Sequence, residues 1–204
     1  GTACMSEQKP SLDVKPTYDA SVDVDQQAHV PDKKFQQPEV ISVRHGSFGV
    51  IDDGDTTGFG GLTQVFTLPG ATPRPYGSWF DEAVDILEEE ILKEGLQVND
   101  VIEKVVVNQQ NELIVNVKRE HLRFIAKTLR DDQDLRFEMC LGVSAVNYPG
   151  DKGRELHALY PFRSFTHKRN IFLEVSVADE DPVIPSIVDI YPGNDWSERE
   201  GWDL

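Results

Sequence analysis

Apolar residues in the middle of this chain switch from helical spacing to strand-like runs and back again. Residues 78–95 and 120–129 place apolar side chains at steps of three and four, which is typical of a helix with one buried face. The two stripes contain Phe80, Ala83, Ile86, Leu87 and Ile91, and Leu122, Ile125, Ala126 and Leu129. Ser78 is predicted to cap the first helix and Gly95 to end it.

Strand-like runs surround these helices. Residues 101–107 and 113–117 flank a turn at residues 108–111 and predict two neighbouring strands. Residues 135–148 predict a long central strand, and residues 155–165 and 170–177 predict a hairpin. Asn194 or Asp195 is expected to cap a last helix. The pattern predicts an α+β fold: a mostly antiparallel sheet with two helices on one face, an extended N-terminal arm and a C-terminal helix.

The chain divides into four segments by composition. Residues 1–40 are predicted to be a flexible acidic and polar tail, because their isolated apolar residues cannot offset the entropy of ordering. Residues 41–77 form an arm rich in Gly and Pro, with short apolar runs at 40–43, 48–51 and 62–68 and a turn at Asp53-Gly54. Residues 78–181 are the α+β domain, and residues 182–204 are a Pro-rich exit followed by the last helix.

Charge excludes several classes of partner. The 204 residues carry 36 acidic and 20 basic side chains, for a formal net charge of −16. A nucleic-acid platform or an anionic membrane surface requires clustered Lys and Arg, so neither is expected. No apolar run approaches the roughly 20 residues of a membrane-spanning helix. The first residues lack the pattern of a signal peptide, so export is not expected.

Residue types that perform chemistry are scattered. Cys4 and Cys140 are far apart, which predicts a reducing compartment and no metal site on this chain. The five histidines are expected at solvated or hydrogen-bonded positions, with His121, His157 and His167 on the surface. Residues 58–61, Gly-Phe-Gly-Gly, lack the Gly-Lys-Ser/Thr of a phosphate loop. We therefore expect no catalytic site and treat a nucleotide site on this arm as the weakest alternative.

The acidic C-terminal segment is the strongest candidate site. Residues 81–104 and 179–204 each carry a net charge of −7. In the second segment, the acids are interleaved with Trp196, Trp202 and Leu204. Large aromatic side chains beside charges are typical of an interface anchor and its rim. One interpretation is that Arg199 only pairs with Asp195 and Asp203 along the helix. The other is that Trp196, Arg199 and Trp202 face a partner chain.

The run from Trp196 to Leu204, Trp-Ser-Glu-Arg-Glu-Gly-Trp-Asp-Leu, follows a Pro-x-x-Pro-Ser segment that begins at Pro182. Together with residues 137–149 and the predicted hairpin, it resembles the thirty-kilodalton subunit family of bacterial NADH-quinone oxidoreductase, the C subunit of respiratory complex I. The resemblance covers residues 80–204. Family members continue past this run into a tail that wraps a partner, so we expect the C-terminal signature to be truncated here.

The resemblance implies a structural subunit of an enzyme, with no active site, flavin, iron–sulfur cluster or quinone of its own. It implies a place in the hydrophilic arm on the cytoplasmic side of the cell membrane, against the D and B subunits of complex I and, as a further candidate, the I subunit. Electrons would pass from NADH through FMN and clusters on the neighbours to quinone, with proton pumping by the complex. An accessory subunit of a related membrane-bound hydrogenase is the alternative. The expected interface residues are Trp196, Glu198, Arg199, Glu200, Trp202, Asp203, Pro182 and Pro185.

Overall fold

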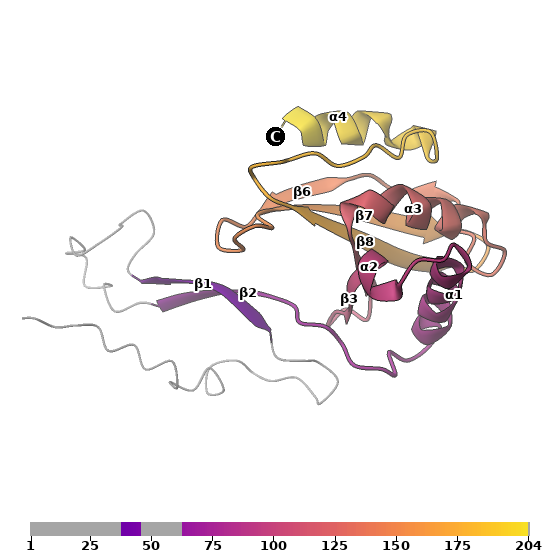
Figure 1. Ribbon diagram of the computed structural model, residues 1–204, viewed down its shortest axis with the longest axis horizontal. Helices are drawn as coiled ribbons and strands as arrows, with labels where there is room; N and C mark the ends of the chain where they lie inside the picture. Colours follow the sequence, from indigo (N-terminus) through magenta and orange to yellow (C-terminus); the bar gives the residue numbers. More distant parts are fainter. Residues whose placement is uncertain (1–37, 46–62, 204) are drawn as a thin grey trace, which may run out of the picture. The chain divides into compact units, whose positions relative to one another are not determined.

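A computed structural model describes residues 38–45 and 63–203 of the chain (Figure 1). The strands are β1 (Glu39–His45), β2 (Thr63–Leu68), β3 (Ile102–Val107), β4 (Leu113–Val117), β5 (Met139–Cys140), β6 (Ser144–Asn147), β7 (Leu156–Ser164) and β8 (Arg169–Val177). The α-helices are α1 (Phe80–Lys93), α2 (Val98–Val101), α3 (Leu122–Asp131) and α4 (Asp195–Asp203), and the 3-10 turns are η2 (Arg119–His121) and η3 (Pro192–Asn194).

The main sheet has the order β3-β4-β8-β7-β5, and β6 also pairs with β7. Its pairs are antiparallel except for β4 and β8, which run parallel. The predicted hairpin is β7 and β8, and the predicted pair at residues 101–117 is β3 and β4. The α+β fold with a mostly antiparallel sheet is confirmed.

One face of the sheet carries the apolar core. Leu113, Val115, Leu173 and Phe162 alternate along their strands and are fully buried there. The apolar stripes of α1 and α3 join the same core, and α3 lies across β7 and β8 in Figure 1. Removing this apolar area from water is the main force that holds the layers together. The predicted two helices on one face are confirmed.

The first helix begins differently from the prediction. Ser78 has a positive φ of 56° and lies before the helix, so it does not cap it. The Asp81 carboxylate instead accepts hydrogen bonds from the backbone N–H groups of Tyr76 and Gly77, at 3.0 and 2.8 Å. Gly95 follows the helix with a φ of 78°, as predicted for a left-handed end residue.

The predicted long strand at residues 135–148 is wrong in its extent. The structure has two short strands there, β5 and β6. The pairing moves by one residue between Cys140↔Phe162 and Ser144↔Leu159, so the segment between them holds one extra residue. Gly142, with a φ of 150°, lies at this break, because its missing Cβ permits a backbone that other residues avoid.

The described part of the N-terminal arm is a separate antiparallel pair of strands, β1 and β2. They correspond to the predicted apolar runs at 40–43 and 62–68. The run at 48–51, the turn at Asp53-Gly54 and the Gly-rich residues 58–61 lie outside the described residues. The four predicted segment boundaries stay predictions.

Candidate protein interface

The C-terminal segment leaves the sheet through an irregular stretch of chain. Pro182 is exposed and Pro185 is half-buried in this stretch, which contains no helix or strand until η3. Proline fixes its own φ and keeps the preceding residue extended, so the two prolines favour this path. Ile184 packs against the core between them.

Three side chains then return into the core. Ile187 is fully buried, and Ile190 and Tyr191 are nearly so. The Tyr191 hydroxyl lies 2.7 Å from the carbonyl oxygen of Phe137 and 3.3 Å from that of Ala126. Burial raises the pKa of Tyr191, so the hydroxyl stays protonated and can donate. These contacts fix the segment between α3 and the strands.

Arginines of η2 and α3 hold the same segment from outside. Arg119 pairs with Asp181, and Arg130 Nη1 donates to the Ile190 carbonyl oxygen at 2.9 Å. Arg123 donates to both carboxylate oxygens of Asp189, and this contact lowers the pKa of that carboxyl group. Each exposed pair contributes little energy, but together they fix the orientation of the chain. The sequence analysis missed these anchors, although three arginines on one side of a short helical stretch were a usable signal.

The start of α4 is attached to the domain by Glu198. Its Oε1 accepts the Ile187 N–H at 2.9 Å and lies 3.3 Å from the Asn194 side-chain nitrogen. Ser197 lies on the same side, because a Cβ built on Gly142 would be 3.4 Å from its Oγ. One side of α4 therefore faces its own domain. Glu198 belongs to that side, and its predicted contact with a partner stays a prediction.

The other side of α4 is open. Trp196 exposes 75% of its surface, the most among the exposed large apolar residues of the described chain. The guanidinium carbon of Arg199 lies 5.6 Å from the centre of the Trp196 ring, a cation–π arrangement. Glu200 is also exposed. Residues 196, 199 and 200 share one helical face at steps of three and four.

Arg199 does not pair with Asp195 in the part of the chain that the structure describes. The interpretation that Arg199 only pairs along its own helix is therefore wrong for Asp195, within the described residues. The side chains of Trp202 and Asp203 lie outside the described ones, so their predicted roles and the Arg199–Asp203 pair stay predictions.

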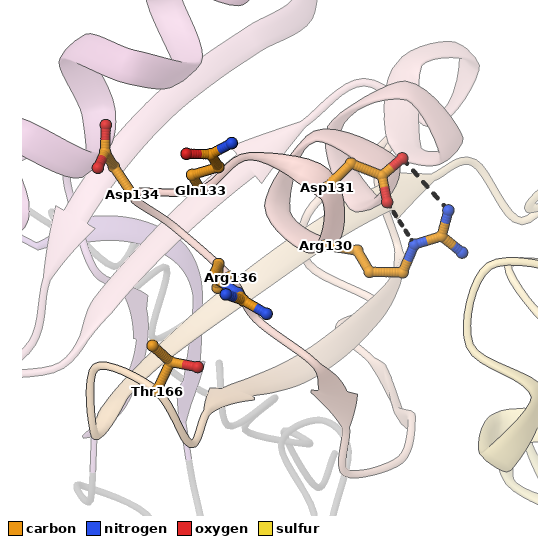
Figure 2. Close-up of a pocket in the computed structure, with 6 residues that line it drawn as sticks. All are labelled: Arg130, Asp131, Gln133, Asp134, Arg136 and Thr166. Carbon is orange, nitrogen blue, oxygen red and sulfur yellow. Dashed lines mark hydrogen bonds and ion pairs between the residues drawn. The ribbon is translucent and has the colours of Figure 1, made fainter.

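Figure 2 shows a surface hollow at the end of α3. It is lined by Arg130, Asp131, Gln133, Asp134, Arg136 and Thr166. Arg130 and Asp131 pair with each other, with Nε and Oδ1 2.7 Å apart. Small-molecule sites are mostly apolar with a few polar groups, whereas this hollow is lined entirely by polar and charged side chains. The hollow fits a solvated surface better than a substrate pocket.

The expectation that His157 lies on the surface is wrong. His157 is 4% exposed, with Nδ1 2.6 Å from Glu174 and Nε2 3.2 Å from Asp151. Burial lowers the pKa of His157, but the two carboxylates outweigh it and raise that pKa above its ordinary value. The strand register places His157 on the sheet face opposite the helices, beside Glu174 rather than in solvent. This cluster crosslinks β8 to the β6–β7 turn.

Cys140 is buried and free, and burial raises the pKa of its thiol to about 11. Within residues 38–45 and 63–203, no group of three or more His, Cys, Asp or Glu side chains could hold a metal ion. No helix of the described chain is both long and apolar enough to cross a membrane.

Comparison with known proteins gives one family. The family model described as "Respiratory-chain NADH dehydrogenase, 30 Kd subunit" matches residues 115–204, from β4 through α4. The C subunit of NADH-quinone oxidoreductase from Streptomyces coelicolor is 51% identical over 192 residues, covering 94% of this chain and 74% of that protein.

A second curated relative and a solved structure also match. The same subunit of Mycolicibacterium paratuberculosis is 56% identical over 166 residues, covering 81% of this chain and 70% of that protein. A solved trypsin-resistant fragment of Nqo5 matches with a TM-score of 0.48 and 21% identity, over 60% of this chain and 90% of the fragment. From the two close relatives and the family model, the chain belongs to the family of respiratory-chain NADH dehydrogenase 30 kDa subunits, the C subunits of NADH-quinone oxidoreductase.

Proposed function

We propose that this chain is a non-catalytic structural subunit of the peripheral arm of proton-pumping NADH-quinone oxidoreductase. In this role it holds two neighbours in place, the D subunit with the quinone site and the B subunit with the terminal cluster, and the I subunit is a further neighbour. FMN, iron–sulfur clusters and quinone belong to the neighbours. The chain lies on the cytoplasmic side of the cell membrane and meets the membrane only through the complex.

One observation supports this role above the others: an exposed Trp–Arg pair on a helix whose base is fixed. Trp196 and Arg199 are the residue types that most often dominate binding energy at interfaces. A Trp side chain offers about 150–250 Å² of surface for burial. Because Glu198 and the buried Tyr191 fix the base of α4, little ordering entropy is lost when a partner covers that surface.

The names of the relatives favour this role over the membrane-bound hydrogenase alternative, since both close relatives are subunits of NADH-quinone oxidoreductase. A free nucleotide-binding enzyme would need the Gly-rich arm, and residues 58–61 are outside the described part. No observation on the described residues favours either alternative.

The test is co-purification of Trp196→Ala and Arg199→Ala chains with a tagged neighbouring subunit. Both variants are expected to fold as stably as the parent chain and to be incorporated less, by about tenfold or more for Trp196→Ala if it is a hot spot. Leu92→Ala is the matched control, because Leu92 is an exposed apolar residue on α1, away from this helix. Full incorporation of both α4 variants would contradict the proposed role of this face.

A further inference from the structure

The outermost strands beside α4 form an edge that nothing in their sequence protects. Residues 139–147 contain no charged side chain and no proline, in a chain with 27% charged residues. Met139, Leu141 and Val146 each expose between 43% and 52% of their surface along this edge. Edge strands of soluble proteins usually carry charges or prolines that block pairing with another chain. The absence of both is unusual for an edge that stays in solvent.

The backbone of β6 has free hydrogen-bonding groups on its outer side. Among the described strands, β6 pairs only with β7, in the register Ala145↔Ala158 and Asn147↔Leu156. The Tyr148 N–H donates to the Glu155 carbonyl at 2.7 Å, so the alternating pattern makes Val146 and Ser144 the next residues bonded to β7. The N–H and C=O groups of Ala145 and Asn147 therefore point away from β7. Within the described residues, neither N–H group has a partner.

We propose that this edge accepts, through β-strand addition, an extended segment of a neighbouring subunit. The inference rests on the proposed function, because it names how the neighbour is held. The added strand would bond the outward groups of Ala145 and Asn147 and cover the exposed side chains of Val146 and Leu141. α4 contacts β6 and lies beside it in Figure 1, so the strand would run next to α4.

Charge decides which chain supplies the strand. The described side chains of α4 include three acids, Asp195, Glu198 and Glu200, and one base, Arg199. A second copy paired edge to edge would bring two such acidic segments to one seam, where like charges repel. A foreign strand that carries Lys or Arg near Asp195 and Glu200 meets complementary charge instead. The occupant is therefore a neighbouring subunit with an apolar, basic extended segment.

The test uses proline, which removes one N–H group. Ala145→Pro removes an outward donor and leaves the ladder to β7 intact, a position that tolerates proline. Ala145→Val keeps the N–H group and is the matched control. The full chain with Ala145→Pro is expected to unfold at the parent temperature but to lose at least tenfold in recovery with the complex, while Ala145→Val is recovered normally. Normal recovery of a folded Ala145→Pro chain would overturn the proposal.

Hydrogen–deuterium exchange separates this proposal from the proposed function. In the purified complex, the amides of Ala145 and Asn147 are expected to exchange at least tenfold more slowly than in the full chain alone. If the parent chain co-purifies with the complex but these amides exchange equally fast, strand addition is wrong and the structural role stands. Slow exchange in the chain alone would show that a second copy or its own chain fills the edge, which also overturns the proposal. Failure of the parent chain to co-purify would instead count against the structural role.

Discussion

Two parts of the C-terminal segment both mix acids with large apolar side chains, but their environments are opposite. Residues 181–191, the anchored part, combine acids with large apolar side chains and insert Ile187 and Tyr191 into the core. α4, the presented part, has the same mixture but leaves Trp196 in solvent. What differs is the neighbouring surface: α3 supplies arginines to the first part, while the second contacts its domain through Ser197 and Glu198. The mixture of acids and large apolar side chains thus does not show which part packs on the domain and which part stays in solvent.

The largest expected effect is in the anchored part. Ile187→Ala should lower the free energy of unfolding by about 2–5 kcal/mol, because it leaves a cavity at a fully buried position. Val183→Ala, at a residue 58% exposed in the same segment, should change it by less than about 0.5 kcal/mol. Urea denaturation of the two variants measures the contrast. Equal, small losses would show that residues 181–191 are not anchored.

A smaller effect is expected from the hydroxyl of Tyr191. Tyr191→Phe leaves the Phe137 carbonyl oxygen, 2.7 Å from the hydroxyl, without this donor, at a cost of about 1–3 kcal/mol in the free energy of unfolding. Tyr160→Phe is the control, since the hydroxyl of that buried tyrosine has no hydrogen bond to any residue that the structure describes. Losses of the same size in both variants would point to packing rather than to the hydrogen bond.

The sheet and helices were predictable because the spacing of their apolar residues depends only on positions close together in the chain. The stripes of α1 and α3 and the β7–β8 alternation are set by neighbours three, four or two positions away in the chain. The signature after Pro182 likewise identified the family, which the relatives confirm. Ile86 is one exception within a stripe, since Val84 takes the more buried position.

The features that were missed depend on contacts distant in sequence. The sequence predicts a solvated position for His157, because charged residues lie near it in the chain. The pairing of β7 with β8 instead places Glu174 beside it. The break in the strand at residues 139–147 depends on a register shift against β7. Glu198 lies in a charged helix and was predicted to face a partner. Its carboxylate instead accepts a hydrogen bond from the backbone N–H of Ile187, eleven residues earlier. The spacing of apolar residues along the chain does not reveal such contacts.

The smallest stability effect should come from acid titration of the Arg123–Asp189 pair. The pKa of Asp189 is lowered by the hydrogen bond from Arg123, so its contribution is present above the ordinary Asp pKa of about 3.9 and is lost as pH falls through the folded value. Below pH about 4 the amides of residues 181–191 should therefore lose protection, measured as exchange relative to the unstructured chain at the same pH. An Asp189→Asn chain should lack this dependence. The pKa of the Asp189 carboxyl group can be measured by NMR titration. An ordinary value of about 3.9 would contradict the pairing with Arg123.

Whether a neighbour covers Trp196 is decided by hydroxyl-radical footprinting of the chain alone and of the purified NADH-quinone oxidoreductase. Oxidation at each tryptophan and tyrosine is read by mass spectrometry, with the buried Tyr191 as an internal reference. We predict that Trp196 is oxidised rapidly in the free chain and, in the complex, as slowly as Tyr191. Equal oxidation of Trp196 in both samples would contradict the claim that α4 presents this side chain to a partner.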